Sequence, residues 1–372
     1  MLPRHSVAKR PTSMPVVNAD AEAWNPLPGA RGTAADYRAP MATTRIIIDT
    51  DPAMGSAGGD PEDSFAILLA LNSPELTVEG LTVVQGNVPV DHGYANAVHL
   101  LDLLGRRDVP VLAGIERPLD PERRLQLAWL EQRGGLERLV PSATPPAGDP
   151  HAVDFLVQTV LENPGEIVLV TIGPLSNVAR ALEREPSLAE KIPRIVMMGG
   201  AATVPGNITP AAEFNIWADP EAAHRVFESG VPICMVGLDV CEQTHLNEDV
   251  VKRLEAAPSE LARFVARAVG PWIELRRNVF GADDLHLYDS LAVAIAFRPD
   301  LVRSSEAFVA VETEGTHTAG ATVSYLNPLL RAALTGREPN VDVALEVDRA
   351  GFEALFAERV IAPLEAPSVL GA

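Results

Sequence analysis

Five carboxylates crowd one short stretch of the chain, residues 45–71, which reads RIIIDTDPAMGSAGGDPEDSFAILLAL. They are Asp49, Asp51, Asp60, Glu62 and Asp63, on a loop rich in glycine and proline. So much negative charge destabilises a fold unless a cation neutralises it, and oxygen ligands suit Ca²⁺ or Mg²⁺, so the stretch indicates a divalent metal site. An EF-hand is excluded, because the loop lacks the Asp-x-Asp-x-Asp-Gly spacing and the closing Glu of that motif.

Two elements must position these carboxylates. The apolar run at residues 46–48 predicts a buried strand, and residues 64–71 have the spacing of a helix that Pro61, Glu62 and Asp63 introduce. Ligands bind at the carboxyl ends of strands in α/β sheets, so this loop stands where a site is expected. Each residue alone has a simpler explanation, because aspartate is common in turns and acidic residues are favoured at a helix start.

The composition excludes several classes of function. With 372 residues, 47% of them hydrophobic, the chain can bury a large core, and its net charge of −20 argues against a nucleic acid polymer as partner. No apolar run approaches the ~20 residues of a membrane span, so no membrane partner is expected. The two cysteines, Cys234 and Cys241, lie in or beside a predicted core strand, which argues against a disulfide framework and favours a reducing, cytoplasmic location.

The first 42 residues differ from the rest in composition. They have scattered proline and glycine, few branched apolar residues and no periodicity, and they lack the apolar region of a secretory signal. Met41 directly precedes the patterned sequence, so the natural start could be there. We predict that residues 1–42 are a disordered tail or a mis-assigned start, and that residues 43–372 form one domain.

Predicted strands and helices alternate through that domain. The alternation predicts a single α/β domain with a mostly parallel, doubly wound (Rossmann-like) central sheet flanked by helices. Beyond the first strand and helix, strands are predicted at 76–84, 109–113, 166–171, 194–198, 231–238, 307–312 and 341–347, and helices at 92–104, 247–277 and from 350. Residues 114–150 are poorly patterned and charged, as in a loop that covers a site.

Two segments resemble one known family. DTDPAMGSAGGDPEDS resembles the signature Asp-Thr-Asp-Pro-Gly-x-Asp-Asp of the inosine–uridine-preferring nucleoside hydrolases, with an insertion and with Glu62 in place of the first paired Asp. PGNITPAAEFNIWADPEAAHRVF, which begins at Pro205, is similar to that family's Gly-Asn…Glu-Phe-Asn…Asp-Pro-Glu-Ala-Ala. Weaker likenesses are the turn at residues 172–177 and the triplet that begins at Tyr288.

The resemblance implies calcium-dependent hydrolysis of the N-glycosidic bond of a ribonucleoside, giving ribose and a free base. It implies a Ca²⁺ site made by Asp51, Asp63, Asp289 and the main-chain carbonyl of Ile172, with Asp51 also deprotonating the attacking water. The residues that it implies against the ribose are Glu62, Asn87, Asn207, Glu213 and Asn215. Asn87 has an equally good explanation as a turn residue, and Asp219 is better explained as a helix N-cap. We expect a homodimer or homotetramer.

The side of the leaving base departs most from the family. The family's His-Asp-Pro reads Tyr288-Asp289-Ser290 here, and the lid histidine is absent from residues 114–150. Tyr288 is therefore a candidate acid, although packing is the better explanation, and Trp217 or Trp129 could stack on the base. His286, two residues before Tyr288, is expected to be solvated.

Two other functions explain parts of the sequence. A strand followed by Asp-Thr-Asp also suits a metal-dependent phosphohydrolase, which would leave residues 207–215 unexplained. Glu62, Tyr288 and the missing lid histidine would suit a ribosyl-binding paralogue with little catalysis. Release of phosphate, release of ribose, or binding without turnover separates the three.

Overall fold

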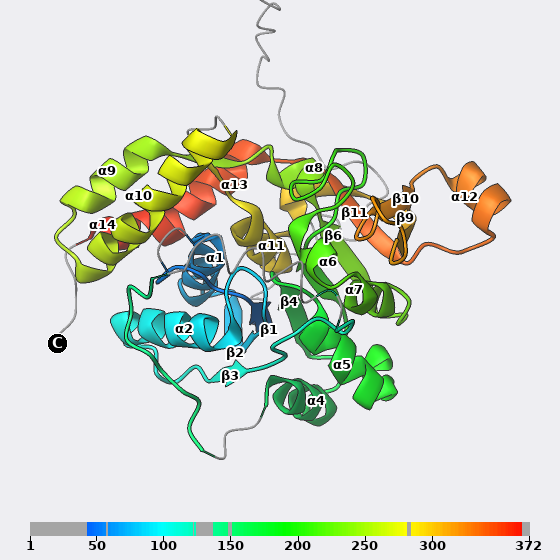
Figure 1. Cartoon of the computed structure of the whole chain (residues 1–372), viewed down its shortest axis with the longest axis horizontal. Coiled ribbons are helices and arrows are strands. Elements are labelled where there is room, and N and C mark those ends of the chain that lie inside the picture. The colour runs from blue at the N-terminus through cyan, green and yellow to red at the C-terminus, as the bar shows by residue number, and fades with distance from the viewer. Residues whose placement is uncertain are drawn as a thin grey trace, which may run out of the picture.

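The computed structural model describes residues 43–56, 59–121, 123, 137–147, 151–280 and 284–366 (Figure 1). Predictions for residues 1–42, for Trp129 and for part of the expected lid, including residues 124–136, therefore lie outside the described residues. The central sheet is made of nine strands: β1 (Thr44–Thr50), β2 (Leu76–Val83), β3 (Val111–Ala113), β4 (Ile167–Thr171), β5 (Ile195–Met198), β6 (Ile233–Val236), β9 (Val302–Val311), β10 (Thr322–Tyr325) and β11 (Val341–Val347).

The strand order is β10-β9-β11-β6-β5-β4-β1-β2-β3. Neighbours from β3 to β11 run parallel, and β9 and β10 add an antiparallel edge. The segment β3-β2-β1-β4-β5-β6 has the order of a doubly wound sheet, which confirms the predicted fold class. In such a sheet the order reverses between β1 and β4, and the crevice at their carboxyl ends is where ligands bind.

Helices cover both faces of the sheet (Figure 1). The core on one face includes residues of α1 (Glu62–Leu71), α2 (Val90–Leu104), α10 (Glu260–Phe280), α11 (Tyr288–Phe297) and α13 (Arg349–Phe356). The core on the other face includes residues of α4 (Ala152–Glu162), α5 (Ser176–Arg184) and α7 (Pro220–Phe227). Ile46 and Ile48 point into the first core and Ile47 into the second. Strands buried on both faces need unbroken apolar runs, which is why the sequence revealed them.

Some boundaries and short elements differ from the prediction. The helix expected over residues 247–277 is two helices, α9 (Glu248–Ala256) and α10, and the strand expected to reach residue 238 ends at Val236, before α8 (Leu238–Cys241). A small antiparallel sheet, β7 (His245–Asn247) with β8 (Asp284–His286), was not predicted, and neither was α6 (Phe214–Ala218). Elements of three to five residues are too short to carry a periodic signal.

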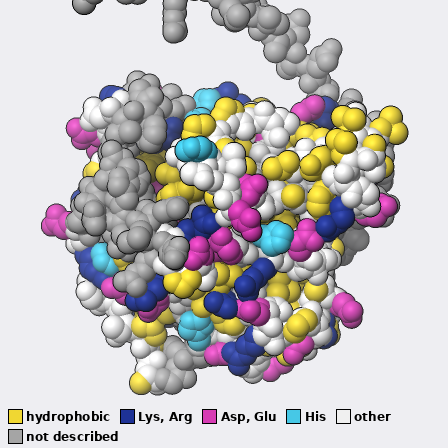
Figure 2. All heavy atoms as spheres, turned by 45° about the vertical axis from the view of Figure 1, so that its right-hand side comes forward, with side chains coloured by type: hydrophobic (Ala, Val, Ile, Leu, Met, Phe, Trp, Pro, Cys, Tyr) yellow, Lys and Arg dark blue, Asp and Glu magenta, His cyan; other side chains and the backbone are white. Residues whose placement is uncertain are grey.

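A helix outside the core, α12 (Pro328–Thr335), follows β10 and contains no buried residue. Asn327 caps it by accepting hydrogen bonds from the amides of Leu329 and Leu330. Leu329, Leu330 and Leu334 are 81%, 55% and 71% exposed. Figure 2, in which this side of the molecule comes forward, shows hydrophobic side chains gathered on it.

Cys234 and Cys241 are free thiols, and burial raises the pKa of Cys234 to about 12. Among the helices that the structure describes, none is both long and apolar enough to cross a bilayer.

Candidate active site

Asp51 lies directly after β1 and is completely buried. Its Oδ2 accepts a hydrogen bond from the amide of Asn87 at 2.5 Å, whereas its Oδ1 has no hydrogen-bond partner among the described residues. Gly86 and Gly173, from the ends of β2 and β4, enclose the carboxylate. A Cβ at either position would lie only 2.0 Å or 2.7 Å from an Asp51 oxygen, so both positions require glycine.

Asp63, in the first turn of α1, is fixed against the same loop. Its Oδ1 accepts from the Thr50 hydroxyl at 2.6 Å and from the Asp51 amide at 3.0 Å, and its Oδ2 accepts from Asn87 Nδ2 at 3.2 Å. The fold therefore brings Asp63, from a helix start, together with Asp51 and Asn87, which the sequence placed after two strands. Asn87 is more than a turn residue, because its side chain reaches the carboxylates.

Glu62 and Asp289 form the other half of the acidic cluster. The two Glu62 oxygens accept hydrogen bonds from the Asp289 amide at 2.8 Å, the Ser290 amide at 3.3 Å and the Ser290 hydroxyl at 3.1 Å. Glu62 and Asp289 are only 1% and 6% exposed. The cluster thus joins the first turns of α1 and α11.

Burial and mutual repulsion raise the pKa values of this cluster. Burial is the largest cause for Asp51, Glu62, Asp63 and Asp289, and the charge of Asp63 raises the pKa of Asp51 and of Asp289 further. Burial raises the pKa of Asp60 to about 7, with Arg276 opposing the shift. Without a cation, these groups lose part of their charge as protons bind; a cation would favour the charged forms.

The donor set fits a hard cation. Buried Asp51, Asp63 and Asp289 offer carboxylate oxygens, buried Ile172 directly after β4 offers a main-chain carbonyl, and all-oxygen ligation suits Ca²⁺. The buried Asp51 Oδ1 without a donor is the atom that a cation would satisfy. Within the described residues, no three His, Cys, Asp or Glu side chains are grouped as a metal centre; here the carboxylates accept amide and hydroxyl hydrogen bonds instead.

Asn215 and Glu213 flank this cluster on α6. Asn215 Nδ2 donates to the Ile172 carbonyl at 3.1 Å. A residue predicted to bind the sugar is therefore hydrogen-bonded to a residue predicted to bind the metal. Glu213 caps α6, because its carboxylate accepts from the amides of Gly200, Asn215 and Ile216 at 3.0, 2.9 and 3.2 Å. Burial raises the pKa of Glu213 to about 7, and these amides oppose the shift.

Asn207 lies on the exposed rim of the same segment. Its Oδ1 accepts from the amide of Phe214 at 2.9 Å, so the loop before α6 is fastened to that helix. Asp219 is the N-cap of α7, as predicted, and accepts from the Ala222 amide at 3.1 Å with Pro220 following it.

Asn177 and Thr82, which both bond to Asp49, were not identified as site residues from the sequence. Asn177 Nδ2 donates to Asp49 Oδ1 at 2.8 Å, and the Thr82 hydroxyl donates to the same oxygen at 2.6 Å. Burial raises the pKa of Asp49 to about 7. Asn177 closes the turn after β4, and this turn position was the only signal that could have identified it.

Tyr288 and Trp217 were predicted to lie near the leaving base, and His286 is close to Tyr288 in the sequence. The Tyr288 hydroxyl is hydrogen-bonded to Arg276, and burial raises its pKa despite the nearby guanidinium. His286, which was expected to be solvated, is half-buried with Nδ1 3.1 Å from the Thr244 carbonyl. Trp217 is half-buried on α6 with its ring 6.2 Å from that of Phe214.

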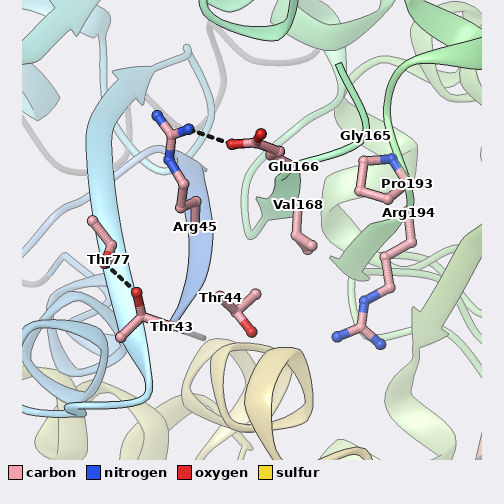
Figure 3. A pocket seen from close by; sticks show the side chains of 9 residues that line it. All are labelled: Thr43, Thr44, Arg45, Thr77, Gly165, Glu166, Val168, Pro193 and Arg194. Carbon is pink, nitrogen blue, oxygen red and sulfur yellow. Dashed lines mark hydrogen bonds and ion pairs between the residues drawn. The ribbon is translucent and has the colours of Figure 1, made fainter. Parts of the chain in front are cut away.

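A separate hollow of about 660 Å³ lies at the opposite edge of the sheet (Figure 3). Residues at the amino ends of β1, β2, β4 and β5 line it, including Arg45 and Arg194. Arg45 is already paired with Glu79 and Glu166, each at 2.7 Å. The hollow is therefore distinct from the carboxylate cluster.

The fold and the site together define an α/β enzyme with an acidic centre at its sheet switch point, and comparisons identify its family. The sequence profile of the inosine-uridine preferring nucleoside hydrolases matches residues 46–354. The pyrimidine-specific ribonucleoside hydrolase RihA of Citrobacter koseri is 39% identical over 85% of this chain and 97% of its own length.

Solved structures agree. A plant nucleoside hydrolase, PpNRh1, matches with a TM-score of 0.76 and 34% identity over 87% of this chain and 100% of its own. The purine-preferring ribonucleoside hydrolase from Gardnerella vaginalis matches with a TM-score of 0.74 and 31% identity over 86% of this chain and 99% of its own. The chain belongs to the inosine-uridine preferring nucleoside hydrolase family. It is an N-glycosidase that hydrolyses ribonucleosides to ribose and base, and this family assignment decides against the phosphohydrolase.

Proposed function

We propose that this hydrolase is Ca²⁺-dependent and that Asp51 is its general base. The observation that carries the proposal is the Asp51 carboxylate, completely buried at the sheet switch point with one oxygen that no described donor satisfies. Asp63, Asp289 and the Ile172 carbonyl would complete the protein ligands. Bound Ca²⁺ would supply a positive charge that lowers the pKa of a water molecule.

Asp51 is suited to take a proton from the water that attacks C1′ of the ribose. As a ligand of the ion, its buried carboxylate would lie beside a water molecule bound to the same Ca²⁺, which is the position that a general base needs. As the new C–O bond forms, the C1′–N bond breaks and the ribose becomes oxocarbenium-like. The surrounding carboxylates stabilise that positive charge, as paired carboxylates do in other glycosidases.

The remaining residues would hold the ribose. Asn87, Asn207 and Asn215 offer amide donors and acceptors, and Glu213 offers a carboxylate, so together they can pair with sugar hydroxyls. Their fixed hydrogen bonds orient them before substrate binds. Glu62 was also predicted to contact the ribose.

The departing base needs a proton or must leave easily. Tyr288 is an uncharged phenol whose pKa burial raises, so it is a weak acid at neutral pH. We therefore propose that bases which leave easily are preferred, with Trp217 a candidate stacking residue. The named relatives divide between pyrimidine and purine substrates, so the proposal extends to ribonucleosides as a class.

We further propose a cytoplasmic homodimer or homotetramer. The two free cysteines support a reducing compartment. The exposed leucines of α12 support self-association, because apolar side chains gathered on one surface favour burial against a partner. Light scattering of wild type and of a Leu329→Asp variant tests the assembly; a monomer in both would contradict it.

The experiment that tests the central proposal is a panel of purine and pyrimidine ribonucleosides scored by reducing-sugar release. We expect turnover that stops on chelation and returns when Ca²⁺ is added. Phosphate esters serve as the control and should release no phosphate. Undiminished turnover after exhaustive chelation would contradict the calcium assignment while leaving the hydrolase activity intact.

A further inference from the structure

The first turn of α11 is capped by a residue of another helix. Glu62, the first residue of α1, accepts hydrogen bonds from the Asp289 amide, the Ser290 amide and the Ser290 hydroxyl, at 2.8, 3.3 and 3.1 Å. α1 and α11 lie side by side although Glu62 and Asp289 are 227 positions apart in the sequence (Figure 1). The residue preceding α11, Leu287, makes no side-chain cap.

These bonds meet a need of the buried helix end. Amides in the first turn of a helix have no intrahelical partner and carry partial positive charge, so a carboxylate satisfies both the hydrogen bonds and the charge. Glu62 is 1% exposed and Ser290 is fully buried, which leaves little access for water to replace it. The Glu62 amide also donates to Asp60 Oδ1 at 3.0 Å, so the cap is tied to the acidic loop.

The length of the side chain matters for this contact. The family signature that this segment resembles has aspartate at the position of Glu62. An aspartate would end one methylene short of the three donors on α11. The glutamate therefore gains a contact that sets the position of the backbone at Asp289.

We propose that Glu62 is a positioning residue that holds Asp289 for the metal ion rather than a ligand of the ribose diol. The inference rests on the proposed calcium site and replaces the role that the resemblance implied for Glu62. The three groups that donate to Glu62 belong to Asp289, which would bind the metal, and to Ser290, which follows it. Supporting residues of this kind change metal affinity without touching the ion.

The test compares Glu62→Asp, Glu62→Gln and Ser290→Ala with wild type. Each metal-stripped protein is titrated with CaCl₂ in a calorimeter, and ribose is titrated separately at saturating Ca²⁺. Thermal melting checks that each variant is folded. Glu62→Gln keeps the length and an acceptor oxygen, and Ser290→Ala removes one bond while leaving Glu62 in place, so both remain informative if Glu62→Asp fails to fold.

We expect Glu62→Asp to weaken Ca²⁺ binding by about 10- to 100-fold, the range found for residues that orient metal ligands. Glu62→Gln and Ser290→Ala should weaken it less, and ribose affinity at saturating Ca²⁺ should not change. Wild-type Ca²⁺ affinity in Glu62→Asp, or loss of ribose binding in Glu62→Gln with Ca²⁺ affinity intact, would overturn the positioning role alone. Wild-type protein that takes up no Ca²⁺ would overturn the proposed calcium site as well.

Discussion

Two buried carboxylates of the site, Asp51 and Glu213, are held in opposite ways. Glu213 accepts three backbone amides, so its charge is stabilised by dipoles that the fold already supplies. Asp51 accepts one amide, and its other oxygen has no described donor. Burial raises the pKa of both.

The difference separates the half that we propose faces the sugar, whose carboxylate has its hydrogen bonds in place, from the acidic half, where one carboxylate oxygen has no described donor. Fixed amide dipoles partly offset the burial of the Glu213 carboxylate, whereas a carboxylate with an unpaired buried oxygen is stabilised by a cation. Removal of metal should therefore disturb the half that contains Asp51, Asp63 and Asp289, and should leave α6 unchanged.

The largest effect is expected from Asp51→Asn. The change keeps the shape and removes both the base and a ligand charge, so kcat should fall by about 10²–10⁴-fold, the range for loss of a positioned general base. Asn207→Ala, on the sugar-facing half, should raise KM substantially and lower kcat less. Steady-state kinetics on the best nucleoside measures both. Equal losses confined to KM would assign Asp51 a binding role.

A smaller effect is expected in stability against pH. In metal-free protein, the pKa values of Asp49 and Glu213 are raised by burial to about 7, while the unfolded chain releases the same protons near pH ~4. The folded state holds more protons between these values, so the free energy of unfolding should fall as pH rises from about 4 to about 7. Urea denaturation at a series of pH values measures this. Glu213→Gln should show a shallower fall, and stability that rises through the window would contradict the account.

Tyr288→Phe should have a modest effect. The change removes the hydroxyl that bonds to Arg276, and kcat on the best nucleoside should fall by less than about tenfold, below the range for a positioned acid. A p-nitrophenyl riboside, whose leaving group needs no acid, is the control substrate and should be cleaved at least as well as inosine or uridine. A hundredfold loss on nucleosides with none on the riboside would make Tyr288 the acid.

Deletion of residues 1–40 should have the smallest effect. The segment lacks the apolar pattern with which to pack on the domain, and the family profile begins only at residue 46. A protein that starts at Met41 should therefore match the full chain in melting temperature and in kcat/KM. A lower value of either would show that the segment contacts the domain.

The sequence predicted those parts of the site that depend on strand ends. β1 and β4 are unbroken apolar runs, so the positions of Asp51 and Ile172 at one sheet edge followed from the α/β pattern. Asn87 followed in the same way from the end of β2. The roles of these residues came from the resemblance, and they stay predictions.

Contacts between distant segments could not be predicted. The cap that Glu62 makes on α11 depends on how two helices pack, and the approach of Arg276 to Tyr288 depends on the course of α10. Neither leaves a periodic signal in the sequence. β7 and β8, three residues each, pair only because the fold brings residues 245–247 and 284–286 together.

The most direct test of the account is thermal melting of the same protein with and without Ca²⁺, with ribose release followed in parallel. An ion that binds only the folded state raises its stability by mass action. We predict that chelation lowers the melting temperature and abolishes turnover, and that Ca²⁺ restores both in wild type, while Asp51→Asn responds much less. A melting temperature and a turnover that chelation leaves unchanged would contradict the claim that the acidic half of this site is completed by a metal ion.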